Sequence, residues 1–330
     1  WSPFKDKKTT IRAGGGLFYQ RLSVGTYAQV LRYNGTTQQS IVILNPVYNP
    51  NFVPGSAFPL TPGSTLSVQN TSIRILDPNM KAPYSANFNI SVERQLPKGL
   101  VATVNYIRSD GAHQFRMRNV NAPLPGTITT TTPDGVRPNP AQGNIFEIES
   151  SAASKANILN FSLNRRTGKW FSFFGNYSFS SIYNNSDGMS LPADSYNLRS
   201  EWGPSGQMSR HQVTIMGRST LPKGFALSTF IIGRSGNPFN INLGQDLNKD
   251  TNFGDRPAGL GRNADLTPDL YSGINLCRTF TSGTCSQTYG QWLAATYPNG
   301  VKAIGPGFIN VNMTLSRTWG FGHKDSASAA

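Results

Sequence analysis

The tetrapeptide Leu-Pro-Lys-Gly occurs twice, at 96–99 and at 221–224, and each copy lies between stretches in which apolar and polar residues alternate. Proline fixes φ near the value that the first inner corner of a tight turn requires, and glycine tolerates the exit geometry, so each copy predicts a chain reversal. Before the first copy, Phe88, Ile90 and Val92 alternate with polar residues, which is the period of a strand with two unlike faces. The chain is therefore predicted to form long-armed β-hairpins.

The rest of the chain repeats this pattern. A third hairpin is expected over 156–182, with Arg-Thr-Gly-Lys as its turn, a further strand over 9–22, and a last strand over 307–319. Segments rich in Asn, Pro, Gly, Ser and Thr separate the hairpins and are expected to be loops, at about 23–83, 119–143, 184–209 and 244–306. Short reversals thus alternate with long excursions.

This alternation predicts an all-β fold, an antiparallel transmembrane β-barrel with short periplasmic turns and long extracellular loops. An arm such as 84–95 has 12 residues, and at about 3.3 Å per residue and a tilt of about 40° it would rise roughly 30 Å, enough for an apolar band of about 25 Å. Strands of soluble proteins are usually nearer five to six residues. The alternative is a large soluble β-sandwich in which the same apolar residues form the core.

Composition narrows the class of protein. Charged residues make up only 14% of the chain, against about 25% in an ordinary soluble domain, and no apolar run approaches the roughly 18 residues of a spanning helix. The formal charge is +14, but the basic residues are scattered and no RNP-type motif is present, so nucleic-acid binding is not expected. Scattered cations on a strand-rich surface fit contact with anionic lipid or lipopolysaccharide better than contact with nucleic acid. A surface that merely keeps the protein soluble explains them as well as lipid contact does.

Two cysteines, Cys277 and Cys285, lie eight positions apart around a Ser-Gly-Thr turn. This spacing predicts a disulfide that closes a hairpin, and with it an oxidising compartment. Two unpaired thiols are the alternative. Neither a second cysteine pair nor a neighbouring histidine supplies a zinc ligand set.

One segment, DLNKDTNFGD, resembles the opening of a calcium loop, because oxygen-bearing side chains recur at alternate positions. Position six is Thr251 where such loops need glycine, and position twelve is Pro257 where they carry glutamate. Weak calcium binding is expected, and ordinary Asp/Asn turn chemistry explains the segment equally well. The candidate ligands are Asp246, Asn248, Asp250, Asn252 and Asp255; no other cofactor is expected.

Catalytic motifs are not found. The chain has three histidines and lacks HExxH, GxSxG, GxxxxGK and GxGxxG. The sequence therefore predicts that the protein is not an enzyme, and no catalytic residue is assigned. A barrel hydrolase whose Ser, His and Asp come from distant loops remains an alternative.

Several blocks follow one another in an order that resembles a known family. They include PYSANFNISVERQLPKGLVATVNYIRSDGAHQFR, GPSGQMSRHQVTIMGRSTLPKG, DLNKDTNFGDRP and GPGFINVNMTLSRTW. The chain resembles the barrel of TonB-dependent outer-membrane transporters, in particular the Oar-like group common in Acidobacteria, whose chains carry a carboxypeptidase-regulatory-like domain before the plug. The resemblance covers nearly all of 1–330. One departure is Ser209, where the family often has Asp before the Arg-His pair.

The resemblance implies part of a 22-stranded barrel in the outer membrane of a Gram-negative bacterium, without its plug, regulatory domain and final strands. The first residues do not read as a signal peptide, so the chain is expected to begin after processing or to be a piece of a longer one. The implied function is energised uptake of a large scarce ligand, such as a siderophore, vitamin, glycan or peptide.

The implied partners are the TonB-ExbB-ExbD complex, acting through the missing plug, outer-membrane lipid or lipopolysaccharide, and an imported ligand that the sequence does not identify. Two other functions stay open. One is a secreted or surface β-sandwich that binds carbohydrate or mediates adhesion, and the other is the outer-membrane barrel hydrolase.

Overall fold

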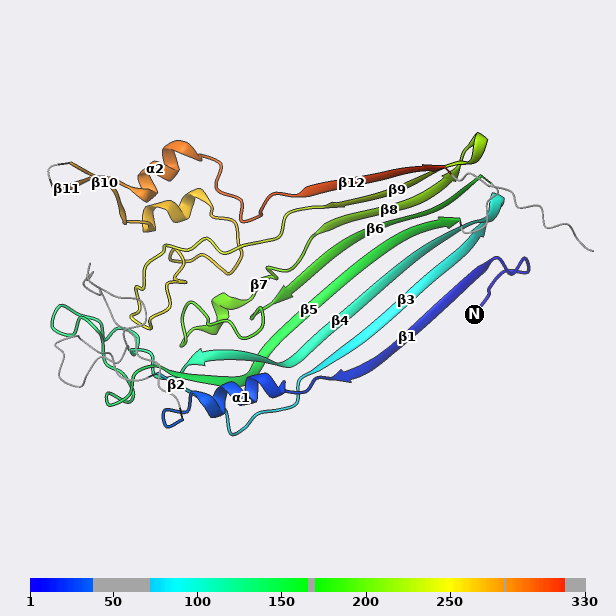
Figure 1. Ribbon diagram of the computed structural model, residues 1–330. Coiled ribbons are helices and arrows are strands. Elements are labelled where there is room, and N and C mark those ends of the chain that lie inside the picture. The colour runs from blue at the N-terminus through cyan, green and yellow to red at the C-terminus, as the bar shows by residue number, and fades with distance from the viewer. Residues whose placement is uncertain (38–71, 166–169, 282, 318–330) are drawn as a thin grey trace, which may run out of the picture.

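A computed structural model describes residues 1–37, 72–165, 170–281 and 283–317, and one large sheet dominates it (Figure 1). The main path of the sheet runs β1-β3-β4-β5-β6-β8-β9-β12, and every neighbouring pair on it is antiparallel. The path follows chain order, which is the up-and-down arrangement of barrels. Its strands are β1 Thr9–Tyr19, β3 Tyr84–Leu96, β4 Leu100–Asn119, β5 Ile145–Arg165, β6 Phe171–Asn184, β8 His211–Thr220, β9 Phe225–Arg234 and β12 Phe308–Arg317. The predicted antiparallel all-β fold is confirmed.

The two Leu-Pro-Lys-Gly segments adopt the same conformation. Each forms a single 3-10 turn, Pro97–Gly99 between β3 and β4 and Pro222–Gly224 between β8 and β9. The lysine of each turn has a left-handed backbone, with φ 63° at Lys98 and φ 62° at Lys223. Both turns lie at one edge of the sheet, here called the turn edge (Figure 1). The third predicted turn, at 166–169, falls outside the described residues.

The long connections leave the opposite edge of the sheet, here called the loop edge (Figure 1). They join β1 to β3, β4 to β5, β6 to β8 and β9 to β12. The described tight turns therefore lie at one end of the strands and the long loops at the other, as in a barrel whose strands cross the whole bilayer. The predicted asymmetry is confirmed for the described connections.

The connections contain short elements where the sequence predicts only loop. These are α1 Val24–Arg32, β2 Ile73–Leu76, β7 Gly203–Pro204, β10 Cys277–Thr281, β11 Thr284–Thr288, α2 Tyr289–Thr296 and two 3-10 helices, Leu198–Glu201 and Pro268–Gly273. Each α-helix begins at a capping side chain, since the Ser23 hydroxyl accepts from the N–H of Thr26 and that of Thr288 accepts from Gln291. Among the described residues, no helix has the length and apolarity to cross a membrane.

The strand register sorts the side chains onto two unlike faces. One cross-strand row runs Val92, Val104, Phe161, Tyr177 and Val213, one residue from each of five successive strands. The adjacent row consists of polar residues, in the order Ser91, Asn105, Asn160, Ser178 and Gln212. Successive residues of a strand point to opposite faces, so one face of the sheet is apolar and the other polar.

The apolar face is exposed. Val92, Val104 and Phe161 keep 40%, 41% and 43% of their accessible surface, and the described residues include no second sheet packed over them. The buried hydrophobic cluster of the described chain lies instead within the β9–β12 connection, around Leu266 and Tyr271. A sandwich core would bury this face, so its exposure indicates contact with lipid.

Candidate functional site

The loops at the loop edge are joined by buried asparagines at the end of β4. Asn119 is 1% exposed, and its Nδ2 donates to Asn144 Oδ1 at 2.9 Å and to the carbonyl oxygen of Asp250 at 3.3 Å. Asn121 Nδ2 donates to three carbonyl oxygens of the β4–β5 loop, those of Asn139, Gln142 and Gly143. Two amides thus fold the β4–β5 loop on itself and attach it to the β9–β12 loop, which satisfies backbone groups that the strands leave unpaired.

The carboxylates of the predicted calcium segment brace its own backbone. Asp246 accepts from the N–H of Asp250 at 3.1 Å through Oδ1 and from that of Thr251 at 2.9 Å through Oδ2. Asp255 Oδ2 accepts from the N–H of Leu247 at 2.6 Å. Such bonds are the turn chemistry of aspartate, which mimics a backbone acceptor.

The two asparagines of the segment hold the neighbouring β6–β8 loop. Asn248 Nδ2 donates to the carbonyl oxygen of Ala193 at 2.8 Å, and Asn252 Nδ2 donates to that of Pro192 at 3.0 Å. In the described part of the chain, no group of three or more His, Cys, Asp and Glu side chains is placed to hold a metal ion. The five predicted ligands thus share one segment, where they make hydrogen bonds within the loop and to the β6–β8 loop, and calcium binding stays a prediction.

Asp250 is the most buried acid of this segment, with 2% of its surface exposed. Burial raises the pKa of its carboxyl group to about 7, and the negative charges of Asp246 and Asp255 add to the effect, while a hydrogen bond from the N–H of Asn252 opposes it. Burial raises the pKa of Asp255 as well. The β4–β5, β6–β8 and β9–β12 loops, which asparagine side chains join, are here called the loop assembly. Near neutral pH, the charge of the Asp250 carboxyl group within it changes with small changes in pH.

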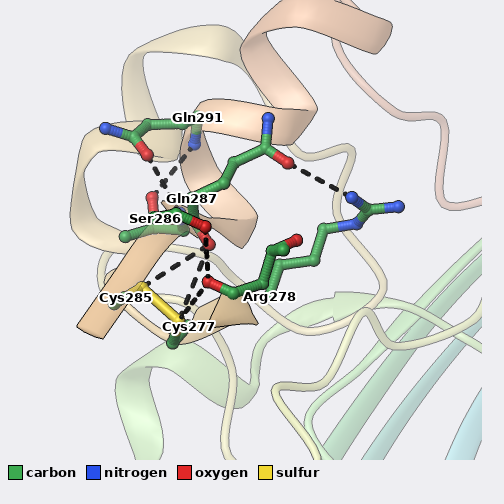
Figure 2. The surroundings of a disulfide bond; sticks show 8 residues. Cys277, Arg278, Cys285, Ser286, Gln287 and Gln291 are labelled. Carbon is green, nitrogen blue, oxygen red and sulfur yellow. Dashed lines mark hydrogen bonds between the residues drawn. A yellow bond between two sulfur atoms is a disulfide. The ribbon is translucent and has the colours of Figure 1, made fainter. Parts of the chain in front are cut away.

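The structure joins Cys277 to Cys285 in a disulfide that ties β10 to β11, as Figure 2 shows. Arg278 Nη1 donates to Gln287 Oε1 across the hairpin at 3.2 Å, and its guanidinium lies 4.8 Å from the ring centre of Trp292, which joins the hairpin to α2. Hairpin and helix form a small unit within the β9–β12 loop. The oxidising compartment that such a bond implies stays a prediction.

A cavity of about 490 Å³ lies against this unit. The β9–β12 loop supplies its whole lining, which includes the apolar residues Leu266 and Leu293, the aromatic Tyr289 and the polar residues Asn242 and Gln245. Its size falls in the range of small-molecule sites, which are mostly apolar with a few polar groups. No motif marks it in the sequence, since its walls come from separate segments of one loop.

A second cavity, of about 530 Å³, lies on the polar face toward the turn edge. Phe174, Met216 and Phe230 pair across β6, β8 and β9 and line it together with Arg218. Phe230 disturbs the alternation of β9 in the sequence, and the register explains why, since this aromatic side chain shares a face with polar neighbours. The polar face thus carries an apolar patch at this position.

Comparison with known proteins places the chain. Residues 1–327 match the outer membrane beta barrel domain family. No curated protein matches the chain. Among solved structures, the outer membrane transporter YddB from Escherichia coli is 13% identical, with a TM-score of 0.47 over 76% of this chain and 30% of that one. The FrpB iron transporter from Neisseria meningitidis, F3-3 variant, is 13% identical, with a TM-score of 0.31 over 50% of this chain and 21% of that one.

The chain thus spans less than a third of the length of either solved transporter. The match to the family covers almost every residue, and the sheet has the exposed apolar face that lipid contact requires. The chain belongs to the outer membrane beta barrel domain family, and it is a protein of the outer membrane.

Proposed function

We propose that this chain is a barrel segment of a TonB-dependent outer-membrane transporter of the Oar-like group, which takes up a large scarce ligand such as a siderophore, vitamin, glycan or peptide. The observation that carries the proposal is the construction of the loop edge. Three long loops, cross-linked by amide side chains and by the ion pairs Glu201–Arg256 and Asp187–Arg262, lie over one end of a lipid-facing sheet. A receptor needs such a preformed surface on the outside of the cell.

The turn edge then faces the periplasm and the loop edge the exterior. The apolar face contacts lipid and the lipid part of lipopolysaccharide, and the polar face lines the lumen. The cavity at Tyr289 and Leu293 is wide enough for an apolar group of a ligand, with Asn242 and Gln245 as polar contacts.

The two outermost strands of the sheet need partners in the complete protein. Among the described strands, β1 and β12 each pair on one side only. Unpaired backbone groups are costly in hydrocarbon, so in the membrane β1 and β12 each need a further strand beside them to close a barrel. The plug, on which the TonB-ExbB-ExbD complex would act, would belong to the same complete protein. A catalytic role is not part of the proposal, and the absence of enzymatic activity stays a prediction.

The proposal is tested with the full-length parent protein. Proteases added to intact cells should cut it within 244–306, and the purified protein in detergent should bind the periplasmic domain of TonB. Cleavage only after the cells are opened would reverse the topology. Normal surface cleavage without TonB binding would leave the barrel in place and refute TonB-dependent uptake.

A further inference from the structure

Arg116, near the loop edge of β4, is a buried cation without hydrogen-bond partners in the described part of the chain. Its side chain is 1% exposed, and its Nε, Nη1 and Nη2 find no acceptor among the described residues. A guanidinium carries five N–H donors and stays protonated in proteins. It sits opposite Glu149 of β5, beside a register irregularity between Gln114 and Arg116.

The first neighbouring carboxylate is already engaged. Glu149 acts electrostatically on Arg116, but its Oε2 lies 3.0 Å from Arg118 Nη2 and accepts from Arg118 Nε at 3.2 Å. Its Oε1 accepts from the Ser151 hydroxyl at 2.6 Å. Arg118 Nη2 also lies 3.7 Å from Glu147, so this one arginine forms ion pairs with both acidic residues near the start of β5, Glu147 and Glu149.

The second neighbouring carboxylate is engaged as well. Glu201, from the β6–β8 loop, pairs with Arg256 at 2.5 Å and accepts from the N–H of Ala193 at 3.1 Å. The other nearby cation, Arg262 of the β9–β12 loop, pairs with Asp187 at 2.5 Å. Arg116 therefore lies near the β6–β8 and β9–β12 loops, among carboxylates that each pair with another arginine.

The segments outside the described ranges are poor in carboxylates. Segments 38–71 and 166–169 and residue 282 contain no Asp or Glu, and 318–330 contains a single acidic residue, Asp325.

We propose that Arg116 binds a small inorganic anion, of the size of chloride, between the end of β4 and the β6–β8 and β9–β12 loops. A buried charge without partners is strongly unfavourable, and an anion supplies both the opposite charge and an acceptor for several N–H groups. The loops of this chain already enclose the side chain, so a larger ligand or another protein domain does not reach it. The anion would fasten the end of β4 to the β6–β8 and β9–β12 loops.

The direct test is diffraction from crystals of the full-length protein grown in sodium bromide, recorded at the bromine absorption edge. An anomalous peak within hydrogen-bond distance of the Arg116 guanidinium is expected. Water or backbone carbonyl oxygens on all of its donors, without an anomalous peak, would overturn the proposal.

A second test measures hydrogen exchange of the loop amides with increasing chloride, with gluconate keeping the ionic strength constant. For a Kd of about 10 mM, 150 mM chloride should slow loop opening about 15-fold in the native protein. Arg116→Met should lose this response. Arg137→Met is the matched control, since Arg137 already donates to Asn121 O and Asn144 Oδ1, and it should keep the response. An unresponsive native protein, or a response unchanged in Arg116→Met, would refute the site. If Arg116→Met does not fold, the bromide measurement decides.

Discussion

Replacing Asp250 by Asn should remove a pH dependence from the loop assembly. The two side chains have the same shape, and the asparagine Oδ1 still accepts the N–H of Asn252, a bond of 2.8 Å in the native structure. The substitution therefore changes the charge of the group and leaves the turn intact. It isolates the cost of burying a carboxylate beside Asp246 and Asp255.

The magnitude follows from the two pKa values. In the closed loop the pKa of Asp250 is about 7, and in an open, solvated loop it is about 3.9. The closed loop thus binds the proton more tightly, so closure is most favourable below about pH 4 and weakens as the pH rises to about 7. A difference of about three pKa units corresponds to about 4 kcal/mol, all of it lost from closure above pH 7.

The assay is hydrogen exchange on the full-length protein in detergent with EDTA, from pH 5 to pH 8, corrected for intrinsic exchange. The amides of Leu247 and Thr251, which donate within the turn, report its opening. Native protection should fall across this range, whereas Asp250→Asn should show only the smaller fall due to the raised pKa of Asp255, and it should exceed the native protein at pH 8. Asp269→Asn, at an exposed acid of the same loop, should leave the native slope unchanged. A native slope in Asp250→Asn would refute the reasoning.

Three further predictions concern other parts of the chain. Cys277→Ser should lower the stability of the β10–β11 hairpin by about 2.5 kcal/mol, because the disulfide closes a loop between residues eight positions apart and its loss restores the entropy of the unfolded chain. Trypsin should then cut the hairpin faster, and an unchanged cleavage rate would contradict this. Phe161→Arg, on the lipid face, should lower the free energy of unfolding of the barrel by about 2–4 kcal/mol and reduce the folded fraction in heat-modifiability gels. Asn160→Arg, on the lumen face, should leave the folded fraction unchanged, and equal losses in the two variants would contradict the assignment of faces. If the predicted calcium loop binds its ion, millimolar calcium should give a calorimetric heat that Asp246→Ala abolishes, and a native protein without heat excludes the ion.

The sheet was predictable because its signals are local. Alternation with a period of two depends only on which face a residue occupies, and both Leu-Pro-Lys-Gly turns carry their conformation within four residues. The candidate site was less accessible to sequence reasoning. The sequence located the Asp/Asn segment but not the loop that Asn248 and Asn252 hold, since that contact joins residues far apart in the chain.

The sequence by itself thus determined the strands, the turns and the unlike faces of the sheet. Only the tertiary structure decided that β5 begins at Ile145, that Phe230 lies on the polar face, and that Arg116 is buried without an acceptor among the described residues. The physical reason is the range of the interactions. Strand pattern and turn geometry arise between neighbours in the chain, whereas burial and hydrogen-bond satisfaction depend on which distant segments come to lie against a residue.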